Sequence, residues 1–245
     1  MLITNKDNAK LKNLRLLYKD KKERQNQGVF IAEGVNFVKD IEKKAVVRQL
    51  FIKESKHEEL SYLEKKYDLE ALVIKDGIFD SIADTVTPSG VIAIVEKPAI
   101  KDVDGDIVIL LDGIKDAGNL GTIIRTAVAR GVNSVVSVNG TDAYSPKAVR
   151  ASMGGILSVN CIETDLDTAL ELLKEYSIVA LDMGGKCIYS YKREGKIALT
   201  VGSEAQGLSE KIRMEANEII SIPMTNKIES LNAAISISIA MFLVK

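Results

Sequence analysis

The sequence feature that most constrains the fold is an alternation of short apolar runs with stretches of helical periodicity. Residues 107–111 (IVILL) form a continuous apolar run, which is typical of a strand covered on both faces. A Gly-rich loop and a helix are expected at residues 112–131. Further strands are expected at residues 133–138, 154–162, 177–182, 196–202 and 218–223, with helices at 166–176 and from about Ser230 to Val244. Strands that alternate with helices predict a mostly parallel sheet with helices on both faces.

A basic amphipathic helix is predicted near the start of the chain, at residues 7–24. Its apolar positions have helical spacing, and they are Leu11, Leu14, Leu17 and Tyr18. Its remaining faces carry basic residues, namely Lys10, Lys12, Arg15, Lys19, Lys21, Lys22 and Arg24. Short apolar runs and helical patterns then alternate up to residue 96, which predicts a compact α/β unit.

The boundary between the two α/β units is expected at residues 98–106. They belong to the stretch KPAIKDVDGD, which contains one of the four prolines, several charges and little to bury. We therefore expect a small N-terminal domain at residues 1–97, a linker at 98–106 and a larger domain at 107–245.

The charge of the chain is unevenly distributed. The formal net charge is −1, which by itself gives no hint of a nucleic-acid partner. Residues 1–66, however, hold 16 Lys and Arg against 10 Asp and Glu, a net of +6, which leaves 17 against 24, or −7, for the rest. The two ends of the chain therefore have different electrostatic roles.

Composition excludes several kinds of site. Cys161 and Cys187 are the only thiols and lack metal-binding spacing, and His57 is the only histidine. Neither a multi-histidine metal site nor Ser-His-Asp catalysis has enough residues to form. The N-terminal residues lack the apolar core of a signal peptide, and no apolar run reaches membrane-spanning length. We therefore expect a soluble, cytoplasmic protein that uses no metal.

Three segments of the larger domain are candidates for a binding site. The first, GNLGTIIRTA (118–127), follows a buried strand and opens a helix, so its free N–H groups can face an anion. Arg125 lies one or two turns into that helix, where a guanidinium can meet a phosphate. The glycines do not form GxGxxG and no GK[ST] is present. A plain strand-to-helix turn, with Arg125 in a surface ion pair, is the alternative.

The second segment, LTVGSEAQGLS (199–209), places a polar loop after a strand. Gly202 and Gly207 bracket this loop, which contains Glu204. Because Gly202 directly precedes Ser203, the segment does not fit the nucleophile elbow GxSxG, and an α/β-hydrolase is disfavoured. A plain β–α turn is the alternative interpretation.

The third segment, residues 221–244 (SIPMTNKIESLNAAISISIAMFLV), ends in a helix that is apolar or small on nearly all sides. Pro223 ends a strand, and Ser230 and Asn232 open the helix after a polar loop. Such a helix cannot face water on any side. It is therefore expected in the core or in an oligomer interface.

Together, the three segments resemble a known family. NLGTIIRTA, GSEAQGL and IPMTNKIESLNAAISISI resemble the three ordered motifs of the SpoU (TrmH-like) branch of the SPOUT RNA methyltransferases. This resemblance covers about residues 107–245. Residues 1–97, with FIAEGVNFVKDI at 30–41, are similar to the small substrate-binding domain of the same family.

The resemblance implies an activity and a fold. The family transfers a methyl group from S-adenosylmethionine to a ribose 2′-hydroxyl of rRNA or tRNA, and we expect rRNA of the 23S type in preference to tRNA. The family's C-terminal strands and helix form a trefoil knot, which general topology rules would have excluded. A homodimer through the knot region and the C-terminal helix is expected, and no metal is needed.

The resemblance also assigns residues. Those that match cofactor-binding positions are Gly202, Ile222 and Leu231, and we add Gly207 from the same loop. Those that match the catalytic and substrate-orienting set are Asn119, Arg125, Glu204, Ser230 and Asn232. The sequence departs from the family pattern at Asn226, where glycine is more frequent, and at Ala233–Ala234, where valine is more frequent. These departures bear on the choice of substrate more than on activity.

Arg125 matches the family's key residue, but a base is a poor role for it. A guanidinium is almost never neutral at pH 7. Because the sulfonium methyl is already activated, catalysis needs in-line placement of the ribose oxygen, removal of its proton and stabilisation of its developing charge. We expect Arg125 to bind the adjacent phosphate, while Asn119, Glu204 and Ser230 orient the reacting groups.

The basic N-terminal helix is expected to bind RNA through phosphate contacts. The residues assigned to this surface are Lys10, Lys12, Arg15, Lys19 and Lys22. A solvated charged helix without an RNA role is the alternative.

Three other functions stay open at this point. One is an RNA-binding protein of the same fold without catalysis, and another is a SPOUT enzyme that methylates a base nitrogen. The third is a dinucleotide-dependent oxidoreductase. Its sequence signals are the motif GxGxxG and an acidic residue after it. Neither feature is present in the expected place.

Overall fold

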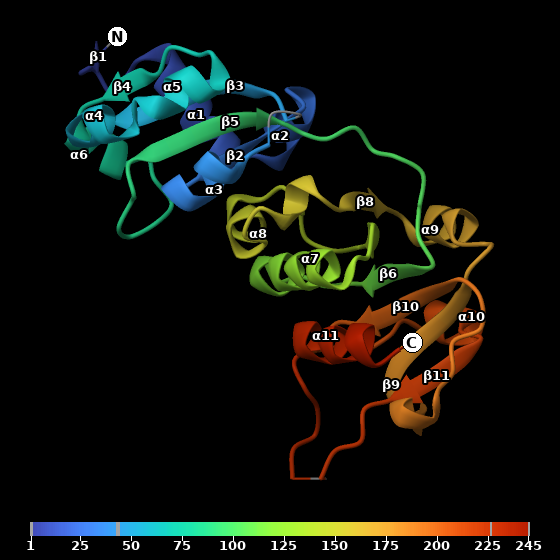
Figure 1. Cartoon of the computed structure of the whole chain (residues 1–245). Coiled ribbons are helices and arrows are strands. Elements are labelled where there is room, and N and C mark those ends of the chain that lie inside the picture. The colour runs from blue at the N-terminus through green and yellow to red at the C-terminus, as the bar shows by residue number, and fades with distance from the viewer. Residues whose placement is uncertain (1, 43–44, 226, 245) are drawn as a thin grey trace. The chain divides into compact units, whose positions relative to one another are not determined.

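The computed structural model of the chain describes residues 2–42, 45–225 and 227–244. It contains two compact units (Figure 1). The N-terminal unit comprises Met1–Ala99 together with Tyr144–Leu157, and the C-terminal unit comprises Ile100–Ala143 and Ser158–Lys245. The segment Tyr144–Leu157 therefore folds with the N-terminal unit although it is flanked in sequence by strands of the other.

The N-terminal unit is built on a mixed five-stranded sheet of order β1-β4-β3-β5-β2. The strands β1, β4 and β3 are parallel, and β5 runs antiparallel to both β3 and β2. The strand bounds are β1 Leu2–Ile3, β2 Val29–Glu33, β3 Val47–Lys53, β4 Leu72–Ile74 and β5 Val91–Glu96. The helices are α1 Ala9–Lys19, α2 Lys21–Asn26, α3 Val35–Asp40, η1 Glu54–Lys56, α4 His57–Leu60, α5 Tyr62–Tyr67, α6 Asp76–Asp80, α8 Pro146–Ala151 and η2 Gly155–Leu157.

The predicted basic helix at residues 7–24 is not continuous. It ends at Lys19, and α2 begins at Lys21, because Asp20 adopts an extended conformation and caps α2. The Asp20 carboxylate accepts hydrogen bonds from the backbone N–H groups of Lys22 and Glu23, at 2.8 and 3.3 Å. The apolar side of α1 is confirmed, since Leu11, Leu14 and Leu17 are fully buried.

The pattern of the predicted helix placed Arg24 on the solvent face, but the structure buries it. Its side chain is only 3% exposed, and its Nη1 donates to the carbonyl oxygens of Leu17 and Tyr18 at 2.6 and 3.3 Å. These carbonyls belong to the last turn of α1, where they lack partners within the helix. Arg24 thus fixes the end of α1 against α2.

The C-terminal unit is built on a six-stranded, fully parallel sheet of order β11-β9-β10-β6-β7-β8, as the sequence predicted. The strand bounds are β6 Ile107–Asp112, β7 Ser134–Val138, β8 Asn160–Thr164, β9 Ser177–Cys187, β10 Ile197–Gly202 and β11 Glu218–Ser221. The remaining elements are α7 Ala117–Arg130, α9 Leu166–Leu172, η3 Ile188–Ser190, α10 Glu210–Glu215 and α11 Ala233–Leu243. The strand expected at 154–162 begins only at Asn160, because Gly155–Leu157 form the short helix η2 instead.

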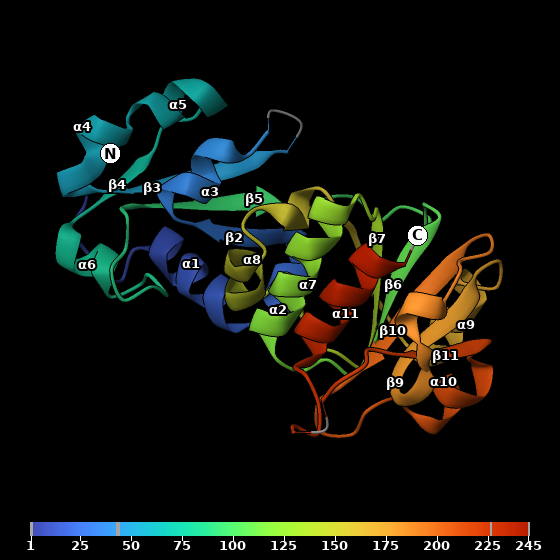
Figure 2. The same ribbon diagram turned by 60° about the horizontal axis from the view of Figure 1, so that its bottom comes forward.

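Helices cover both faces of this sheet (Figure 2). The helices α7 and α11 pack together on one face, and α11 also contacts β10. On the other face, residues of α9 and α10 share a core with alternate residues of β6 and β7, such as Val108 and Val136. All six residues of β6 are buried, as expected for a strand covered on both sides.

The apolar helix α11 is buried along part of its surface. Its buried residues are Ala233, Ala234, Ile237, Ala240 and Met241. Two large apolar residues remain open to solvent, since Ile235 is 48% and Phe242 is 55% exposed. Within the described ranges of the chain, no helix combines the length and apolar character required to cross a bilayer.

The packing of α1 predicts unequal effects for two leucines of one helix. Replacing fully buried Leu14 by alanine is expected to lower the free energy of unfolding by about 2–5 kcal/mol, because it leaves a cavity. Replacing Leu16, which is 43% exposed, is expected to change it by less than about 0.5 kcal/mol. Urea denaturation of the two variants compares these values, and equal losses would contradict the observed packing.

Candidate functional site

The candidate site forms where several parallel strands of the C-terminal unit end. The strand β6 ends at Asp112, β10 at Gly202 and β11 at Ser221, and the three predicted motif segments include the loops that follow. Parallel strands bring their carboxyl ends to one edge of the sheet, which is where open α/β sheets bind ligands. The three segments therefore meet although they are far apart in sequence.

Three of the five predicted catalytic residues form one hydrogen-bonded group, which we call the polar cluster: Asn119, Glu204 and Asn232. Asn119 Nδ2 donates to Glu204 Oε1. Asn232 Nδ2 donates to Asn119 Oδ1 at 3.1 Å and to Glu204 Oε1 at 3.3 Å. Each residue comes from a different motif segment, so the cluster joins all three.

Local structure fixes two members of the polar cluster. Asn119 lies in the first turn of α7, where its backbone N–H donates to the capping carboxylate of Asp116 at 2.8 Å. Asn232 is the N-cap of α11, and its Oδ1 accepts from the N–H groups of Ala234 and Ile235 at 3.0 and 3.2 Å. The amide of Asn232 therefore has two roles, because one atom caps the helix and the other reaches the cluster.

The other two predicted catalytic residues lie outside the polar cluster. Arg125 is exposed on α7 and, within the described ranges, makes no hydrogen bond or ion pair. Ser230 is exposed in the segment before α11 and lines the pocket described next. Their catalytic roles stay predictions. Asn226, one of the two departures from the family pattern, lies outside the described residues.

The four residues predicted to bind the cofactor line one pocket of about 210 Å3. They are Gly202, Gly207, Ile222 and Leu231. The pocket walls are largely apolar, with Leu181 and Val201 among them, while Glu204 and Ser230 add polar groups from the predicted catalytic set. A single concave, mostly apolar site with a few polar groups is the usual form of a small-molecule pocket.

Gly202 is required by the close approach of the loop that follows it. A Cβ atom at this position would lie 2.1 Å from the carbonyl carbon and oxygen of Gly207 and 2.4 Å from the nitrogen of Leu208. The loop folds back because Gly207 adopts φ +66° and its N–H donates to the Ser203 carbonyl at 2.8 Å. Any side chain at 202 would therefore displace the backbone that forms the pocket wall.

An irregularity in β9 contributes a second carboxylate to the pocket. The pairing with β11 shifts from Ala180↔Ile219 to Lys186↔Ile220, so five residues of β9 bulge out between these pairs. Asp182 lies in this bulge, lines the pocket, and forms an ion pair with Arg213 of α10. Sequence reasoning missed both residues. The Gly184–Gly185 pair is the only local signal of the bulge.

Asp112 is a further residue that sequence reasoning missed. It ends β6, is 7% exposed, and accepts a hydrogen bond from the backbone N–H of Ser209 at 2.6 Å. Ser209 in turn caps α10, its Oγ accepting from the Ile212 N–H at 3.4 Å. Asp112 therefore ties the loop containing Glu204 to the central strand. Its place at the carboxyl end of a predicted strand was the available signal.

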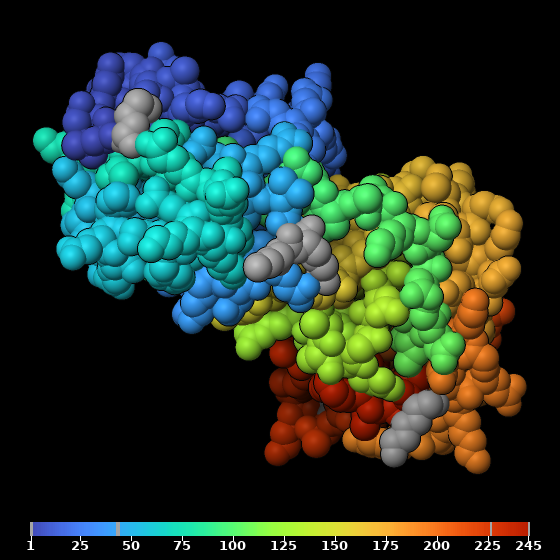
Figure 3. Space-filling model, turned by 45° about the horizontal axis from the view of Figure 1, so that its top comes forward, coloured from blue at the N-terminus to red at the C-terminus, as the bar shows by residue number. Residues whose placement is uncertain are grey.

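The predicted RNA-binding residues lie on two helices of the N-terminal unit. Lys10, Lys12 and Lys19 are exposed on α1, and Lys22 is exposed on α2. Arg15 is half-buried and donates from Nη1 to the Lys6 carbonyl at 2.7 Å. The atoms of α1 and α2, dark blue in Figure 3, form part of the molecular surface.

No metal site accompanies the pocket in the part of the chain that the structure describes. Among those residues, no three His, Cys, Asp or Glu side chains are grouped so that they could hold a metal ion.

Fold and site together define a two-part α/β protein with a small-molecule pocket at the carboxyl edge of a parallel sheet. Residues 106–242 match the model of the SpoU rRNA methylase family, and residues 8–93 match that of an MRM3-like substrate-binding domain. The chain belongs to the SpoU rRNA methylase family, as the three motifs indicated, and is an enzyme of the methyltransferase class.

Curated relatives and solved structures agree with this membership. The 23S rRNA (guanosine(2553)-2′-O)-methyltransferase RlmP of Bacillus subtilis is 27% identical over 241 residues, which cover 96% of this chain and 95% of the relative. The 23S rRNA (guanosine-2′-O-)-methyltransferase RlmB of Escherichia coli is 32% identical over 148 residues, or 58% of this chain and 61% of the relative.

Two solved structures are similar over almost the whole chain. The AdoMet-bound rRNA methyltransferase of Sinorhizobium meliloti has a TM-score of 0.86 and 26% identity, and the match covers 99% of this chain and 96% of that one. The SpoU methyltransferase AviRb of Streptomyces viridochromogenes, in complex with AdoMet, has a TM-score of 0.85 and 25% identity, with 96% and 97% covered.

The contact of Asp112 predicts a graded loss of stability. Asp112→Ala removes the acceptor of the Ser209 N–H and should lower the free energy of unfolding by about 1–3 kcal/mol. Asp112→Asn keeps an oxygen acceptor and should lose less. Urea denaturation measures both losses, and hydrogen exchange of the Ser209 amide reports whether its hydrogen bond is retained.

The matched control for this prediction is Asp106→Ala, at the opposite end of the same strand. Asp106 has a 74% exposed side chain and a 3.6 Å ion pair with Arg193, so its loss should cost less than about 1 kcal/mol. If Asp112→Ala were as mild as this control, the positioning role of Asp112 would be wrong.

Proposed function

We propose that the chain transfers the methyl group of S-adenosylmethionine to a ribose 2′-hydroxyl of 23S-type rRNA. The observation that carries this proposal is the polar cluster beside the pocket, in which Asn119, Glu204 and Asn232 come from all three family motifs. The relatives RlmP and RlmB are named as 23S rRNA 2′-O-methyltransferases. A tRNA-related structure matches only 56% of this chain, with a TM-score of 0.51.

The pocket residues fit S-adenosylmethionine. Apolar walls such as Leu181 and Ile222 suit its adenine and aliphatic parts, and the close backbone at Gly202 leaves amide and carbonyl groups to bind its polar edges. Two carboxylates border the pocket: Asp182 is paired with Arg213, and Glu204 matches a ligand that carries positive charge. When bound, the cofactor supplies a sulfonium methyl group that needs no further activation.

The residues beside the pocket position the ribose. Asn119 and Asn232 hold the Glu204 carboxylate by two hydrogen bonds, so its orientation is set before the substrate arrives. Ser230, exposed on the pocket rim, orients the substrate with them. This arrangement places the reacting oxygen and limits the reorganisation that the reaction requires.

Arg125 stabilises negative charge on the reacting oxygen and does not serve as the base. A guanidinium is a cation with no acceptor site, and the exposure of Arg125 on α7 leaves it available to an RNA phosphate. Bound to the phosphate beside the target ribose, it lowers the energy of negative charge on the 2′-oxygen. The names of the relatives favour this ribose reaction over methylation of a base nitrogen or binding without catalysis.

The N-terminal unit is proposed to bind the RNA. The match to a substrate-binding domain at residues 8–93 supports this role, as does the net charge of +6 over residues 1–66. Lys10, Lys12, Lys19 and Lys22 are exposed and can contact phosphates. The matched ranges also support two domains, predicted at 1–97 and 107–245 with a linker at 98–106, although residues 144–157 fold with the N-terminal unit.

A homodimer, a trefoil knot and a cytoplasmic location complete the proposal. Ile235 and Phe242 on α11, with Val128 on α7, leave apolar surface exposed on two helices that pack together, and a second copy would cover it. The knot is proposed from the family alone, and the location from the rRNA substrate.

The proposed role of Arg125 predicts that turnover falls even when the positive charge at this position is kept. Arg125→Lys keeps the charge but loses the planar fork that binds phosphate at two points. Turnover should fall by about tenfold or more, since groups that stabilise developing charge contribute at least that much. Single-turnover methylation measures it, with Arg193→Lys as control. Near-normal turnover of Arg125→Lys would disprove the phosphate-binding role.

The reaction itself is tested by mapping ribose methylation in cells with and without the gene. One 2′-O-methylated nucleotide should disappear from 23S rRNA, and the gene with Arg125→Ala should not restore it. No change at any ribose of rRNA or tRNA, or loss of a base methylation instead, would contradict the proposed function.

A further inference from the structure

A partly buried carboxylate, that of Glu33, organises the N-terminal unit around the end of β2. Glu33 accepts hydrogen bonds from the Tyr18 hydroxyl at 2.5 Å, from the backbone N–H groups of Asp84 and Thr85 at 2.9 and 3.1 Å, and from the Thr85 hydroxyl. Burial, followed by the nearby charge of Glu33, raises the pKa of Tyr18, so its hydroxyl remains a donor. Tyr18 belongs to α1, so this carboxylate joins α1 to the loop after α6.

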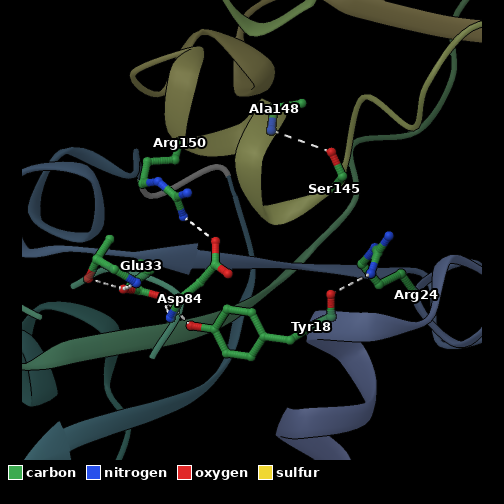
Figure 4. A network of polar contacts seen from close by, with 8 residues as sticks. Tyr18, Arg24, Glu33, Asp84, Ser145, Ala148 and Arg150 are labelled. Atoms are coloured by element: carbon green, nitrogen blue, oxygen red, sulfur yellow. Dashed lines mark hydrogen bonds and ion pairs between the residues drawn. The ribbon is translucent and has the colours of Figure 1, made fainter. Parts of the chain in front are cut away.

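The same loop is joined to α8 by an ion pair. Arg150 Nη1 lies 2.7 Å from Asp84 Oδ2, and both side chains are partly exposed (Figure 4). A continuous chain of contacts therefore runs from Tyr18 on α1 through Glu33 and Asp84 to Arg150 on α8. The basic helix and α8 are held by one network.

The segment that carries α8 is anchored at both of its ends as well. The Tyr144 ring packs against Phe30, with centroids 5.5 Å apart, and Lys97 Nζ lies 4.6 Å from the centre of the same ring. Near the other end, a Cβ on Gly154 would lie 3.5 Å from the Phe37 ring. Residues 144–157 are thus packed into the N-terminal unit at both ends of the segment.

Because residues 144–157 interrupt the C-terminal unit in sequence, the network also bears on how the two units are connected. The chain leaves the C-terminal unit after Ala143 and returns to it at Ser158, so Tyr144–Leu157 adds two chain connections to the one after Ala99. A unit joined to the rest of the chain by several connections has less conformational freedom than a unit joined by one. It therefore loses less conformational entropy when it binds a ligand. Loss of the Asp84–Arg150 contact would loosen these added connections.

We propose that Arg150 is a positioning residue for the RNA substrate, which it serves by holding α8 to the network of Asp84, Glu33 and Tyr18. This inference rests on the proposed function, because it assumes that RNA binds to the basic surface of α1. Arg150 touches neither the pocket nor the polar cluster through any contact given above. Its effect should therefore appear in the affinity for RNA and leave cofactor binding unchanged.

The test uses charge reversal in the full-length protein. Arg150→Glu should raise the KM for 23S rRNA by about fivefold, the upper range for a partly exposed ion pair, with kcat changed less than about twofold. The Kd of S-adenosylmethionine, measured by calorimetry, should stay the same. Hydrogen exchange of residues 144–157 should increase. The double variant Asp84→Arg/Arg150→Glu restores the pair with reversed signs and should recover the KM to within about twofold.

Arg48→Glu is the matched control, because it makes the same charge change in the same unit. Arg48 pairs with Glu96 at 2.8 Å, apart from the network. If Arg150→Glu raises KM no more than Arg48→Glu, or if the double variant fails to recover, the inference is wrong. Wild-type enzyme is assayed alongside, so absence of methylation by the wild type refutes the proposed function, whereas unchanged exchange and KM in Arg150→Glu refute only this inference.

Discussion

The absence of space for a side chain at Gly202 is the constraint on which the rest of the site depends. Because the loop after β10 folds back to within contact of this residue, Gly207 and Leu208 form a wall of the pocket from backbone atoms. The same fold-back sets where Glu204 emerges, and Asp112 holds the far end of the loop to the central strand. The pocket and the polar cluster are therefore two products of one loop conformation, and Asn119 and Asn232 reach Glu204 only because it is fixed there.

Charge is divided between the pocket and its surroundings in a way that suits methyl transfer to RNA. The carboxylate of Glu204 borders the pocket, where it favours a cationic ligand, while Arg125 lies exposed on α7, where it can meet a phosphate. The wider chain repeats this division, with a positive net charge near its beginning and a negative one over the rest. The family membership explains why these features occur together, since the reaction brings a cationic cofactor and a polyanionic substrate to one site.

The sequence predicted those parts of the fold that local patterns encode. Continuous apolar runs such as residues 107–111 indicated a covered parallel sheet, which is present. The apolar helix before Val244 was expected to face water on no side, whereas α11 is buried along one part of its surface and leaves Ile235 and Phe242 exposed. The break at Asp20 was missed because a single capping carboxylate competes with the helical pattern around it. Arg24, Asp112 and the Asp182–Arg213 pair were missed for another reason. Their partners are set by tertiary packing, so the sequence marks at most a position, such as the end of a predicted strand at Asp112, and not the contacts made there. The motif residues Asn119, Glu204 and Asn232 were found through the family resemblance, and the structure then brought them into contact.

The central claim is that the oxygen of one ribose in 23S rRNA accepts the methyl group. The most direct measurement is transfer of labelled methyl from S-adenosylmethionine by the purified enzyme to a 23S rRNA substrate, compared with the same substrate carrying a 2′-deoxyribose at the labelled nucleotide. We predict incorporation at a single ribose of the first substrate and none at that nucleotide in the second. Equal labelling of that nucleotide in both substrates would place the methyl group elsewhere, and would contradict transfer to the ribose 2′-oxygen.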